Sequence, residues 1–376
     1  MSLFNVYPLY DVTPVKAKDV YVYDDKKVRY IDLYGGHAVI SIGHSHPRYI
    51  AAITNQVNKL GFYSNAIQNP LQVDLAEKLN KMSGCTDYQL FLCNSGAEAN
   101  ENALKLASMV TGRAKILAFK NSFHGRTSAA VAATDNPKIV APINAQHQVD
   151  FINLGDLEAA KNILEKNETC AVIVECIQGV GGLDESNTEF YKGLEELCNQ
   201  TGTFYIADEV QSGFGRTGDF FAFQKHGLTP DVISIAKGMG NGFPIGGIMI
   251  HPKYEAQFGM LGTTFGGNHL ACAASLMVLS VMDDEDLMEN VKSVSAHFME
   301  RASKVKQIKR VKGRGLMLGL EFDFNVSDLR KKLIYDYKIF TGSAKNPNLI
   351  RILPPMTVQN KHIDMFFDAI EKELNK

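Results

Sequence analysis

Apolar and polar residues alternate along the first part of the chain. Residues 19–24 and 28–34 both follow this period of two, and the polar run 24–27 separates them. Side chains on a strand point alternately to its two faces, so two such runs joined by a short polar turn predict a β-hairpin. The pattern ends at the glycine pair 35–36, and the hairpin is expected to belong to a small antiparallel unit outside the main core.

Helical periodicity marks the segments after this hairpin and the C-terminal third of the chain. Apolar residues that recur three or four positions apart are typical of an amphipathic helix. The segments with this spacing are 47–60, 71–82, 270–281, 287–304 and 364–374. A single strand entered through a glycine turn is expected at 313–321.

From residue 88 the pattern changes to short apolar strands that alternate with helices. Strands are expected at 89–93, 115–119, 170–175, 204–208 and 232–236, and helices at 97–110 and 190–201. Continuous apolar strands separated by helices are typical of a largely parallel sheet that is covered on both faces. Ligands of such sheets bind beyond the C-terminal ends of the strands, so the residues that follow these strands are the candidates for function.

Composition and charge favour small-molecule partners. The chain has 376 residues, of which 45% are hydrophobic and 21% charged, with a formal net charge of -2 and with acids and bases mixed along its length. This balance is ordinary for a globular protein and offers no broad basic face to nucleic acid or an anionic membrane. No apolar run approaches the roughly 20 residues of a membrane span. The N-terminus lacks the charged start and apolar core of a signal peptide, so a cytoplasmic location is expected.

The cysteines and histidines form no pattern typical of a metal site. The six cysteines are scattered without a Cys-x-x-Cys pair, which is typical of free thiols in a reducing compartment. His44 and His46 lie two residues apart, but no acidic or sulfur ligand accompanies them in the sequence. We therefore predict no bound metal and interpret residues 43–47 as a loop that ends in proline.

Candidate chemistry concentrates at the strand ends. Lys237 ends an apolar, β-branched run and opens a glycine-rich loop. Partial desolvation would lower the pKa of its ammonium group, and a neutral amine can form a Schiff base with a carbonyl. Most lysines at strand ends are surface residues, so this interpretation needs support from elsewhere. Asp208 follows another apolar strand, and a buried carboxylate there requires a cationic or hydrogen-bonding partner.

Two further strand ends suit the same ligand. Residues 94–97 lead through a glycine straight into a helix, whose free N–H groups suit an anion, although ordinary helix capping explains the same residues. The spacings of a P-loop and of a dinucleotide-binding fingerprint are absent. Phe123 and Arg126 offer a stacking ring and a carboxylate clamp. With Asp208 for the pyridine nitrogen and Lys237 for the aldehyde, these parts fit pyridoxal phosphate.

The same segments resemble the class III (ω-) aminotransferases, and most closely the acetylornithine/succinylornithine aminotransferase family of arginine metabolism. The similarity extends over nearly the whole chain and rests on residues 43–47, 94–101, 123–127, 208–218, 236–238 and 263–268. It implies an α/β fold of the fold-type I PLP-dependent transferases, with a mostly parallel seven-stranded sheet in a large domain. A smaller α+β domain would come from both chain ends, with residues 1–46 and 272–376 in the small domain and 47–271 in the large PLP-binding domain. The resemblance also implies a homodimer with active sites at its interface.

The resemblance implies roles for individual residues as well. Lys237 and Asp208 would be catalytic, with Lys237 as both cofactor anchor and general base. The other implied cofactor contacts are Ser95, Gly96 and Ala97 at the phosphate, Phe123 and Val210 on the two faces of the ring, Gln211 at the ring oxygen, and Thr264 at the phosphate of the neighbouring subunit. The implied substrate contacts are Thr263, Arg126 for the α-carboxylate of an acylated ornithine or the side-chain carboxylate of glutamate, and Arg351 for the α-carboxylate of glutamate or 2-oxoglutarate.

The implied reaction is a ping-pong transamination. The δ-amino group of an N2-acylornithine, acetyl or succinyl, passes to 2-oxoglutarate and leaves a semialdehyde and glutamate. Two departures from the family concern the substrate side. Val180 replaces a glutamate that pairs with the arginine in most relatives, so either Glu175 is the partner of Arg351 or Arg351 stays open. Residues 35–41 also differ from the usual sequence.

Three alternatives remain open. An ornithine or 4-aminobutyrate-type ω-aminotransferase would use a different amino donor on the same fold. An aminomutase, racemase or decarboxylase would not need two carboxylate-binding arginines. A catalytically silent relative would not need Lys237 and Asp208 together.

Overall fold

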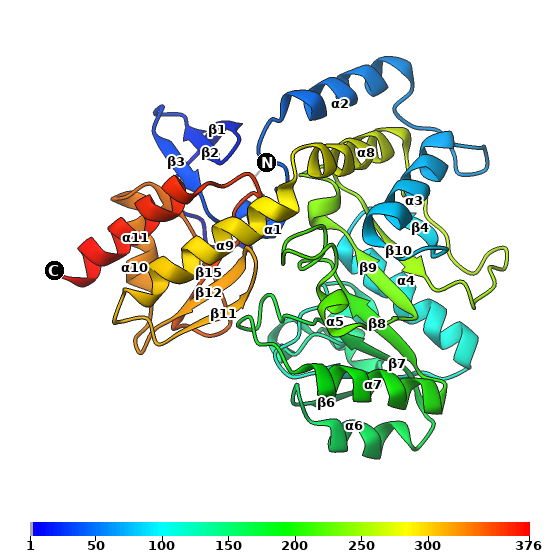
Figure 1. Ribbon diagram of the computed structural model, residues 1–376. Coiled ribbons are helices and arrows are strands. Elements are labelled where there is room, and N and C mark those ends of the chain that lie inside the picture. The colour runs from blue at the N-terminus through cyan, green and yellow to red at the C-terminus, as the bar shows by residue number, and fades with distance from the viewer. Residues whose placement is uncertain (1–2) are drawn as a thin grey trace.

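The main sheet of the protein has seven strands. The computed structural model describes residues 3–376. The strand order is β4 (Gln89–Cys93), β10 (Gly246–Ile250), β9 (Val232–Ile235), β8 (Phe204–Asp208), β7 (Thr169–Val174), β5 (Lys115–Phe119) and β6 (Val149–Ile152) (Figure 1). β10 runs antiparallel to both neighbours and the other neighbouring strands pair in parallel, so the predicted mostly parallel sheet is confirmed. The sequence did not predict β6, which Asp150 interrupts, or β10, which begins with two glycines.

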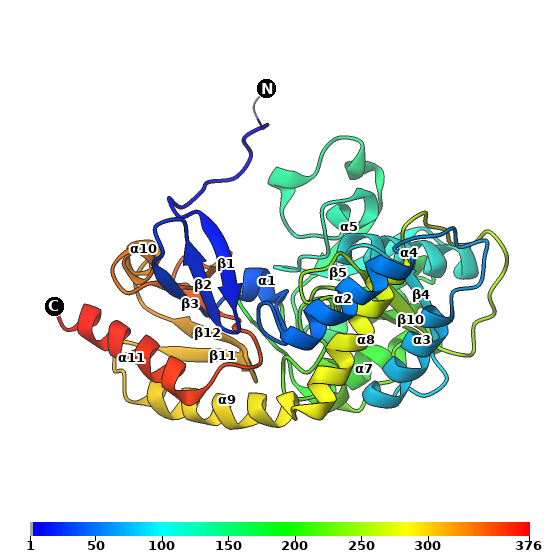
Figure 2. The same ribbon diagram turned by 90° about the horizontal axis from the view of Figure 1, so that it is seen from above.

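Helices cover both faces of this sheet because its strands are apolar on both sides. In β7, Val172 and Val174 belong to the core beneath α7 (Thr188–Thr201), whereas Ala171 and Ile173 belong to the core beneath α4 (Gly96–Thr111). Figure 2 shows α4 and α7 on opposite sides of the sheet. The inward face of α4 carries alanines four residues apart, at 99, 103 and 107, which lets this helix approach the strands closely.

The remaining helices of this body surround the same layers. α8 (His269–Asp284) packs against α2 (Pro47–Lys59) and α3 (Pro70–Ser83), α6 (Leu157–Leu164) packs beside α7, and the short α5 (Ser128–Ala132) packs beside α4. The helices predicted in the segments of α2, α3, α4, α7 and α8 are confirmed. α7 begins two residues earlier than expected, because the Asn187 side chain caps it by accepting from the N–H of Phe190 at 2.8 Å.

Two four-stranded sheets lie beside the main body (Figure 1). One has the order β1 (Pro14–Lys18), β2 (Tyr21–Asp24), β3 (Arg29–Asp32) and β13 (Ile339–Phe340), and the other β11 (Arg310–Arg314), β12 (Met317–Glu321), β15 (Leu349–Ile352) and β14 (Gly342–Ser343). The helices α9 (Leu287–Ser303), α10 (Ser327–Tyr335) and α11 (Asn360–Leu374) pack against these sheets and one another. The predicted hairpin is confirmed as β2–β3, and the parallel pair β3–β13 joins the N-terminal and C-terminal parts of the chain.

The strand that was predicted to follow a glycine turn is confirmed as β12. Gly315 has a φ of 56° and turns the chain between β12 and its antiparallel partner β11, which the sequence did not predict. A Cβ at Gly315 would also lie 2.5 Å from the backbone carbon of Thr217, so this turn requires glycine for conformation and for space. Periodicity did not predict β11, because this strand is mostly polar and has no buried residue.

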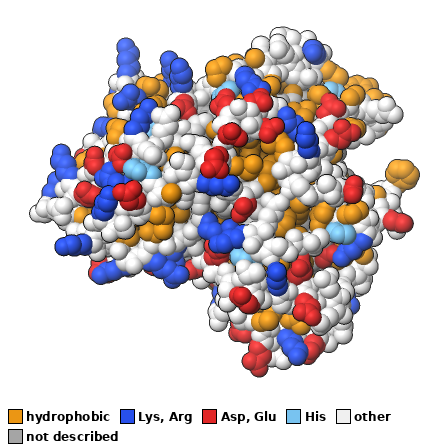
Figure 3. Space-filling view, in the orientation of Figure 1, with side chains coloured by type: hydrophobic (Ala, Val, Ile, Leu, Met, Phe, Trp, Pro, Cys, Tyr) orange, Lys and Arg blue, Asp and Glu red, His pale blue; other side chains and the backbone are white. Residues whose placement is uncertain are grey.

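The two histidines of the 43–47 loop have acidic neighbours that the sequence did not reveal. His44 Nε2 lies 2.8 Å from Asp32 Oδ2, and His46 Nε2 lies 3.0 Å from Glu285 Oε1. Over residues 3–376, no cluster of three or more His, Cys, Asp or Glu side chains is arranged to hold a metal ion. No helix in the same range is long and apolar enough to cross a membrane. Acidic and basic side chains are interspersed on the face shown in Figure 3.

Candidate active site

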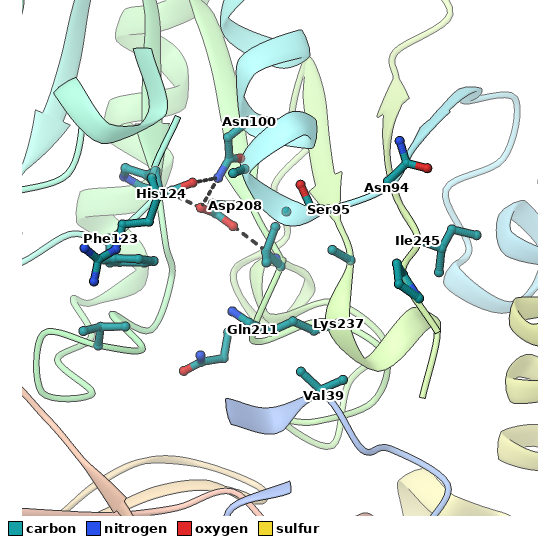
Figure 4. A pocket seen from close by; sticks show the side chains of 18 of the residues that line it. Val39, Asn94, Ser95, Asn100, Phe123, His124, Asp208, Gln211, Lys237 and Ile245 are labelled. Atoms are coloured by element: carbon teal, nitrogen blue, oxygen red, sulfur yellow. Dashed lines mark hydrogen bonds and ion pairs between the residues drawn. The ribbon is translucent and has the colours of Figure 1, made fainter. Parts of the chain in front are cut away.

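A cavity of about 360 Å³ opens at the C-terminal edge of the main sheet. Its walls come from the start of α4, from the segments that follow β5, β7 and β8, and from the segment between β9 and β10. Figure 4 shows side chains from these segments directed into one space. The predicted residues that line it are Ser95, Gly96, Ala97, Phe123, Arg126, Glu175, Asp208, Val210, Gln211 and Lys237. Residues that the sequence placed at separate strand ends therefore share one cavity.

Lys237 lies two residues beyond the end of β9. Its backbone has a φ of 46°, in the left-handed region that residues other than glycine seldom adopt. Burial lowers the pKa of its ammonium group, while the negative charges of Asp208 and Glu175 act in the opposite direction. The lysine is therefore displaced toward the neutral amine, which is the form that attacks carbonyls and accepts protons.

Asp208 ends β8 with its carboxylate buried and hydrogen-bonded at both oxygens. Oδ2 accepts from Nδ2 of Asn100 at 2.8 Å and from Nδ1 of His124 at 2.7 Å. Oδ1 accepts from the N–H of Val210 at 3.1 Å. Three donors from three different segments hold this carboxylate in one orientation toward the cavity (Figure 4).

Sequence reasoning assigned no role to Asn100 or His124. Asn100 lies four residues after Gly96 in α4, so it projects from the same helix face as the cavity-lining helix start. That spacing was a usable signal. His124 follows Phe123 in an irregular segment, and no periodicity there indicates that its ring would be buried against Asp208.

The start of α4 supplies the cavity with backbone donors. Ser95 is the N-cap, and its Oγ accepts from the N–H of Glu98 at 3.2 Å. The N–H groups of Gly96 and Ala97 have no acceptor within residues 3–376, which leaves them available to an anion. A Cβ on Gly96 would lie 2.5 Å from Cγ1 of Val210, so glycine is needed for Val210 to approach the helix start.

The segment after β5 places Phe123 and Arg126 together in the cavity wall. The guanidinium carbon of Arg126 lies 5.9 Å from the centre of the Phe123 ring. The N–H of Phe123 donates to Oε1 of Glu175 at 2.9 Å, which ties this segment to the one after β7. The cavity thus has an aromatic face and a cation side by side, as the sequence predicted.

Of the two possibilities that Val180 leaves, the pairing of Glu175 with Arg351 is not formed. The two oxygens of Glu175 accept from the N–H groups of Phe123 at 2.9 Å and Gly179 at 2.8 Å. This carboxylate therefore fixes two backbone segments and does not pair with an arginine. Desolvation raises the pKa of Glu175 to about 7. Arg351 forms no ion pair with a carboxylate in the described part of the chain, and its recorded acceptors are neutral.

Arg351 does not line the cavity itself, but it contacts Gln211, which does. It lies in β15, and its Nη1 donates to the carbonyl of Gly179 at 2.7 Å and to Oε1 of Gln211 at 3.3 Å. A Cβ on Gly179 would lie 2.2 Å from Oε1 of Gln211, so this contact depends on glycine. Val180 lines the cavity with an apolar side chain. The family resemblance implied that most relatives carry glutamate at this position.

Thr263 and Thr264 lie outside the cavity of their own chain. They belong to the loop between β10 and α8, where Oγ1 of Thr263 accepts from the N–H of Gly266 at 3.1 Å. The Thr264 side chain is exposed. Their predicted contacts with cofactor and substrate stay predictions.

The chain resembles proteins of one family over nearly its whole length. Residues 5–374 match the family model described as aminotransferase class-III. The chain is 38% identical to an acetylornithine aminotransferase of Aquifex aeolicus over 99% of both chains. It is 40% identical to an acetylornithine aminotransferase of Corynebacterium efficiens over 96% of this chain and 92% of the relative. An ornithine aminotransferase structure from Toxoplasma gondii, with partial occupancy of PLP at its active site, superposes with a TM-score of 0.89 at 29% identity, covering 100% of this chain and 93% of the other.

Proposed function

Because this chain belongs to the class III aminotransferases, we propose that it transfers the δ-amino group of an N2-acylornithine, N2-acetylornithine above all, to 2-oxoglutarate. The products are the semialdehyde of the donor and glutamate, and the reaction serves arginine biosynthesis. The observation that carries this proposal is an identity of 35% to 40% with acetylornithine aminotransferases over nearly the whole chain. Ornithine aminotransferases of known structure share the fold at a lower identity, 28% to 29%.

The cofactor of this transaminase is pyridoxal 5'-phosphate, and the cavity suits it. The unpaired N–H groups of Gly96 and Ala97 suit the phosphate, and the buried carboxylate of Asp208 suits a protonated pyridine nitrogen. The lowered pKa of Lys237 suits attachment of the aldehyde. When bound, PLP supplies an electron sink for the bond that breaks at the substrate carbon.

Lys237 has two tasks in this proposal. It anchors the cofactor in the resting enzyme, and its amine, once the donor has displaced it, moves a proton from the substrate carbon as a general base. Asn100 and His124 keep the Asp208 carboxylate aimed at the ring nitrogen. The remaining assigned contacts are Ser95 near the phosphate, Phe123 and Val210 on the faces of the ring, and Gln211 at the ring oxygen.

2-Oxoglutarate has two carboxylates, and the site offers one arginine for each of them. Arg126 lies beside Phe123, while Arg351 lies behind Gln211, so the two cations approach the cavity from different segments. Guanidinium groups bind carboxylates through two parallel hydrogen bonds, which fixes orientation as well as affinity. Arg126 also takes the α-carboxylate of the acylated ornithine. Thr263, which lies outside the cavity of its own chain, is assigned to the substrate site by the same family resemblance.

The domain division follows from the same family membership. The proposed small domain comprises residues 1–46 and the C-terminal part of the chain, and the large PLP-binding domain lies between them. The expected boundary between 271 and 272 falls within α8, which packs against α2 and α3 of the larger body. The parallel pair β3–β13, which joins the two chain ends, supports this division. A cytoplasmic location is supported by the cysteines, which are all free thiols within residues 3–376.

A homodimer is supported by exposed apolar side chains on the larger body. The rings of Phe62 and Phe265 lie 5.4 Å apart on neighbouring loops, and Phe265 follows Thr264 directly in the chain. The exposed large apolar residues of α2 and these loops are Ile50, Val57, Leu60, Phe62, Tyr63, Ile67, Phe258 and Phe265. Apolar surface of this kind is typical of protein interfaces. We assign Thr264 to the phosphate site of the neighbouring subunit.

Mixed dimers test that assignment. Chains carrying Lys237→Ala or Thr264→Glu should each be inactive as homodimers, the second because its carboxylate repels the cofactor phosphate. Their hybrid should regain about half the wild-type activity, since one site then combines an intact lysine and an intact threonine from different chains. The control hybrid pairs wild type with a chain carrying both substitutions and should be inactive. The opposite pattern, an inactive first hybrid with an active control, would show that Thr264 serves its own subunit.

A panel of amino donors tests the reaction. We expect kcat/KM for N2-acetylornithine to exceed that for ornithine and for 4-aminobutyrate by at least about tenfold, because a missing group forfeits its pocket contacts. Comparison of kcat/KM for N2-succinylornithine with that for N2-acetylornithine shows which acyl group the enzyme prefers. A clear preference for unacylated ornithine would replace the proposed donor, and failure to form glutamate from 2-oxoglutarate would favour a PLP enzyme that does not transaminate.

A further inference from the structure

Arg351 is a buried cation with neutral hydrogen-bond partners. The residue is 3% exposed, and no carboxylate within residues 3–376 comes within 4.0 Å of its guanidinium. Its acceptors are the carbonyls of Ser343 (2.5 Å) and Gly179 (2.7 Å), Oε1 of Gln211 (3.3 Å) and the hydroxyl of Tyr34 (3.3 Å). Neutral acceptors fix the orientation of a guanidinium but leave its charge uncompensated, so its attraction for an incoming carboxylate is retained.

Tyr34 is confined against this guanidinium. The guanidinium carbon of Arg351 lies 5.7 Å from the centre of the Tyr34 ring. On its other side, the ring occupies the space that Gly342 leaves open, where a Cβ would lie 2.3 Å from Cε2 of Tyr34. The position of the hydroxyl is therefore set by packing between β14 and Arg351.

His37 determines where the Tyr34 hydroxyl donates. Its Nδ1 lies 2.5 Å from that hydroxyl. Arginine has no acceptor, so the Tyr34 oxygen accepts from Arg351. Nδ1 of His37 can accept the Tyr34 proton when the imidazole carries its own proton on Nε2. The His37 ring is partly open to solvent. Its desolvated part lowers its pKa, and the charges of Arg351 and Lys237 act in the same direction, which favours the neutral ring, the form that can accept. The hydrogen bonds thus run in one sense, from Arg351 to Tyr34 to His37.

An unusual backbone turn carries His37. Gly35, Gly36, His37 and Ala38 have φ values of 54°, 56°, 69° and 63°, so α1 (Gly35–Ala38) is a left-handed turn. The Asp32 carboxylate stabilises its start by accepting from the N–H groups of Tyr34 at 2.9 Å and Gly35 at 2.8 Å. Left-handed backbone at a non-glycine residue is strained and persists where other contacts require it.

This turn adjoins the cavity. Val39, which follows it directly, lines the same cavity as Lys237, and Figure 4 shows the two side chains close together. The strained turn therefore lies at the site, with His37 on its exposed side. Its placement fits a role in substrate handling better than a role in stabilising the fold.

We propose that Tyr34 and His37 are positioning residues for a substrate carboxylate: the hydrogen-bonded chain Arg351–Tyr34–His37 holds the guanidinium in the orientation that receives it. The inference rests on the proposed function in one respect, since it takes Arg351 as the arginine that binds 2-oxoglutarate. Both residues act through Arg351, so their removal changes affinity for dicarboxylates more than it changes the chemical step.

Two substitutions of His37 separate the hydrogen bond from the backbone. His37→Gly relieves the left-handed backbone but removes the acceptor, whereas His37→Asn keeps an acceptor and tolerates that backbone. With His37→Gly we expect the KM for 2-oxoglutarate and the Kd of glutarate, an unreactive dicarboxylate measured by calorimetry on the holoenzyme, to rise about three- to tenfold. kcat should stay within about twofold, and His37→Asn should restore both constants.

Tyr34→Phe provides an independent test of the chain. It should raise the same two constants as His37→Gly does, and the double variant should be no worse than either single variant, because both remove one coupled unit. Additive effects, or equal glutarate binding by wild type, His37→Gly and His37→Asn, would overturn the inference. A wild-type enzyme that forms no glutamate would instead refute the proposed function, so the two failures are distinguishable.

Discussion

Lys237→Ala is expected to lower kcat by at least about 10⁴-fold, since general base catalysis alone contributes about 10²- to 10⁴-fold and the cofactor anchor is lost as well. The cavity that surrounds this residue remains, because its other walls come from separate segments. Borohydride reduction followed by mass spectrometry should find PLP attached to Lys237 in the wild type and no attachment in the variant.

Lys237→Arg is the matched control. Arginine keeps the positive charge and much of the length of the side chain but has no nucleophilic amine, and it does not lose its proton in proteins. We expect this variant to be as inactive as Lys237→Ala. Turnover above about a hundredth of the wild-type rate would mean that the site needs a charge at this position rather than an amine.

Asp208→Asn is expected to lower kcat by about 10²- to 10³-fold, the range found when one preorganised electrostatic group is removed from an active site. The amide carries no negative charge to keep a proton on the pyridine nitrogen. It also presents N–H groups where Asn100 and His124 now donate. The measurement is kcat per bound PLP, which separates weaker chemistry from weaker cofactor binding.

Asp231→Asn is the control for burial. Asp231 is 4% exposed and Asp208 is 5% exposed, so the two substitutions remove carboxylates of nearly equal burial. Asp231 precedes β9 at the opposite end from Lys237, and accepts from the N–H of Tyr205 at 2.7 Å and the hydroxyl of Tyr254 at 2.8 Å. The control should lower Tm and leave kcat nearly unchanged. A similar loss of kcat in both variants would assign the Asp208 effect to general destabilisation.

The parallel sheet and the identity of most cavity residues were predictable because both depend on local pattern. Apolar runs separated by helices indicate strands buried on both faces, and the C-terminal ends of parallel strands meet at one edge. Ser95, Phe123, Asp208 and Lys237 each follow such a strand, and all four line the cavity. The resemblance to a family then supplied the cofactor and the reaction.

The sequence by itself therefore determined which strand ends build the site and which residues there carry chemistry. The tertiary structure alone decided which side chains meet: Asn100 and Asp208 are 108 positions apart in the chain, and Tyr34 and Arg351 are 317 apart. It also determined that Glu175 accepts hydrogen bonds from backbone N–H groups. Likewise, only the tertiary structure brings Tyr34 and His37 together next to Arg351. The physical reason is that periodicity reports only whether a residue is buried, whereas the partner of a buried polar group depends on the path of the whole backbone.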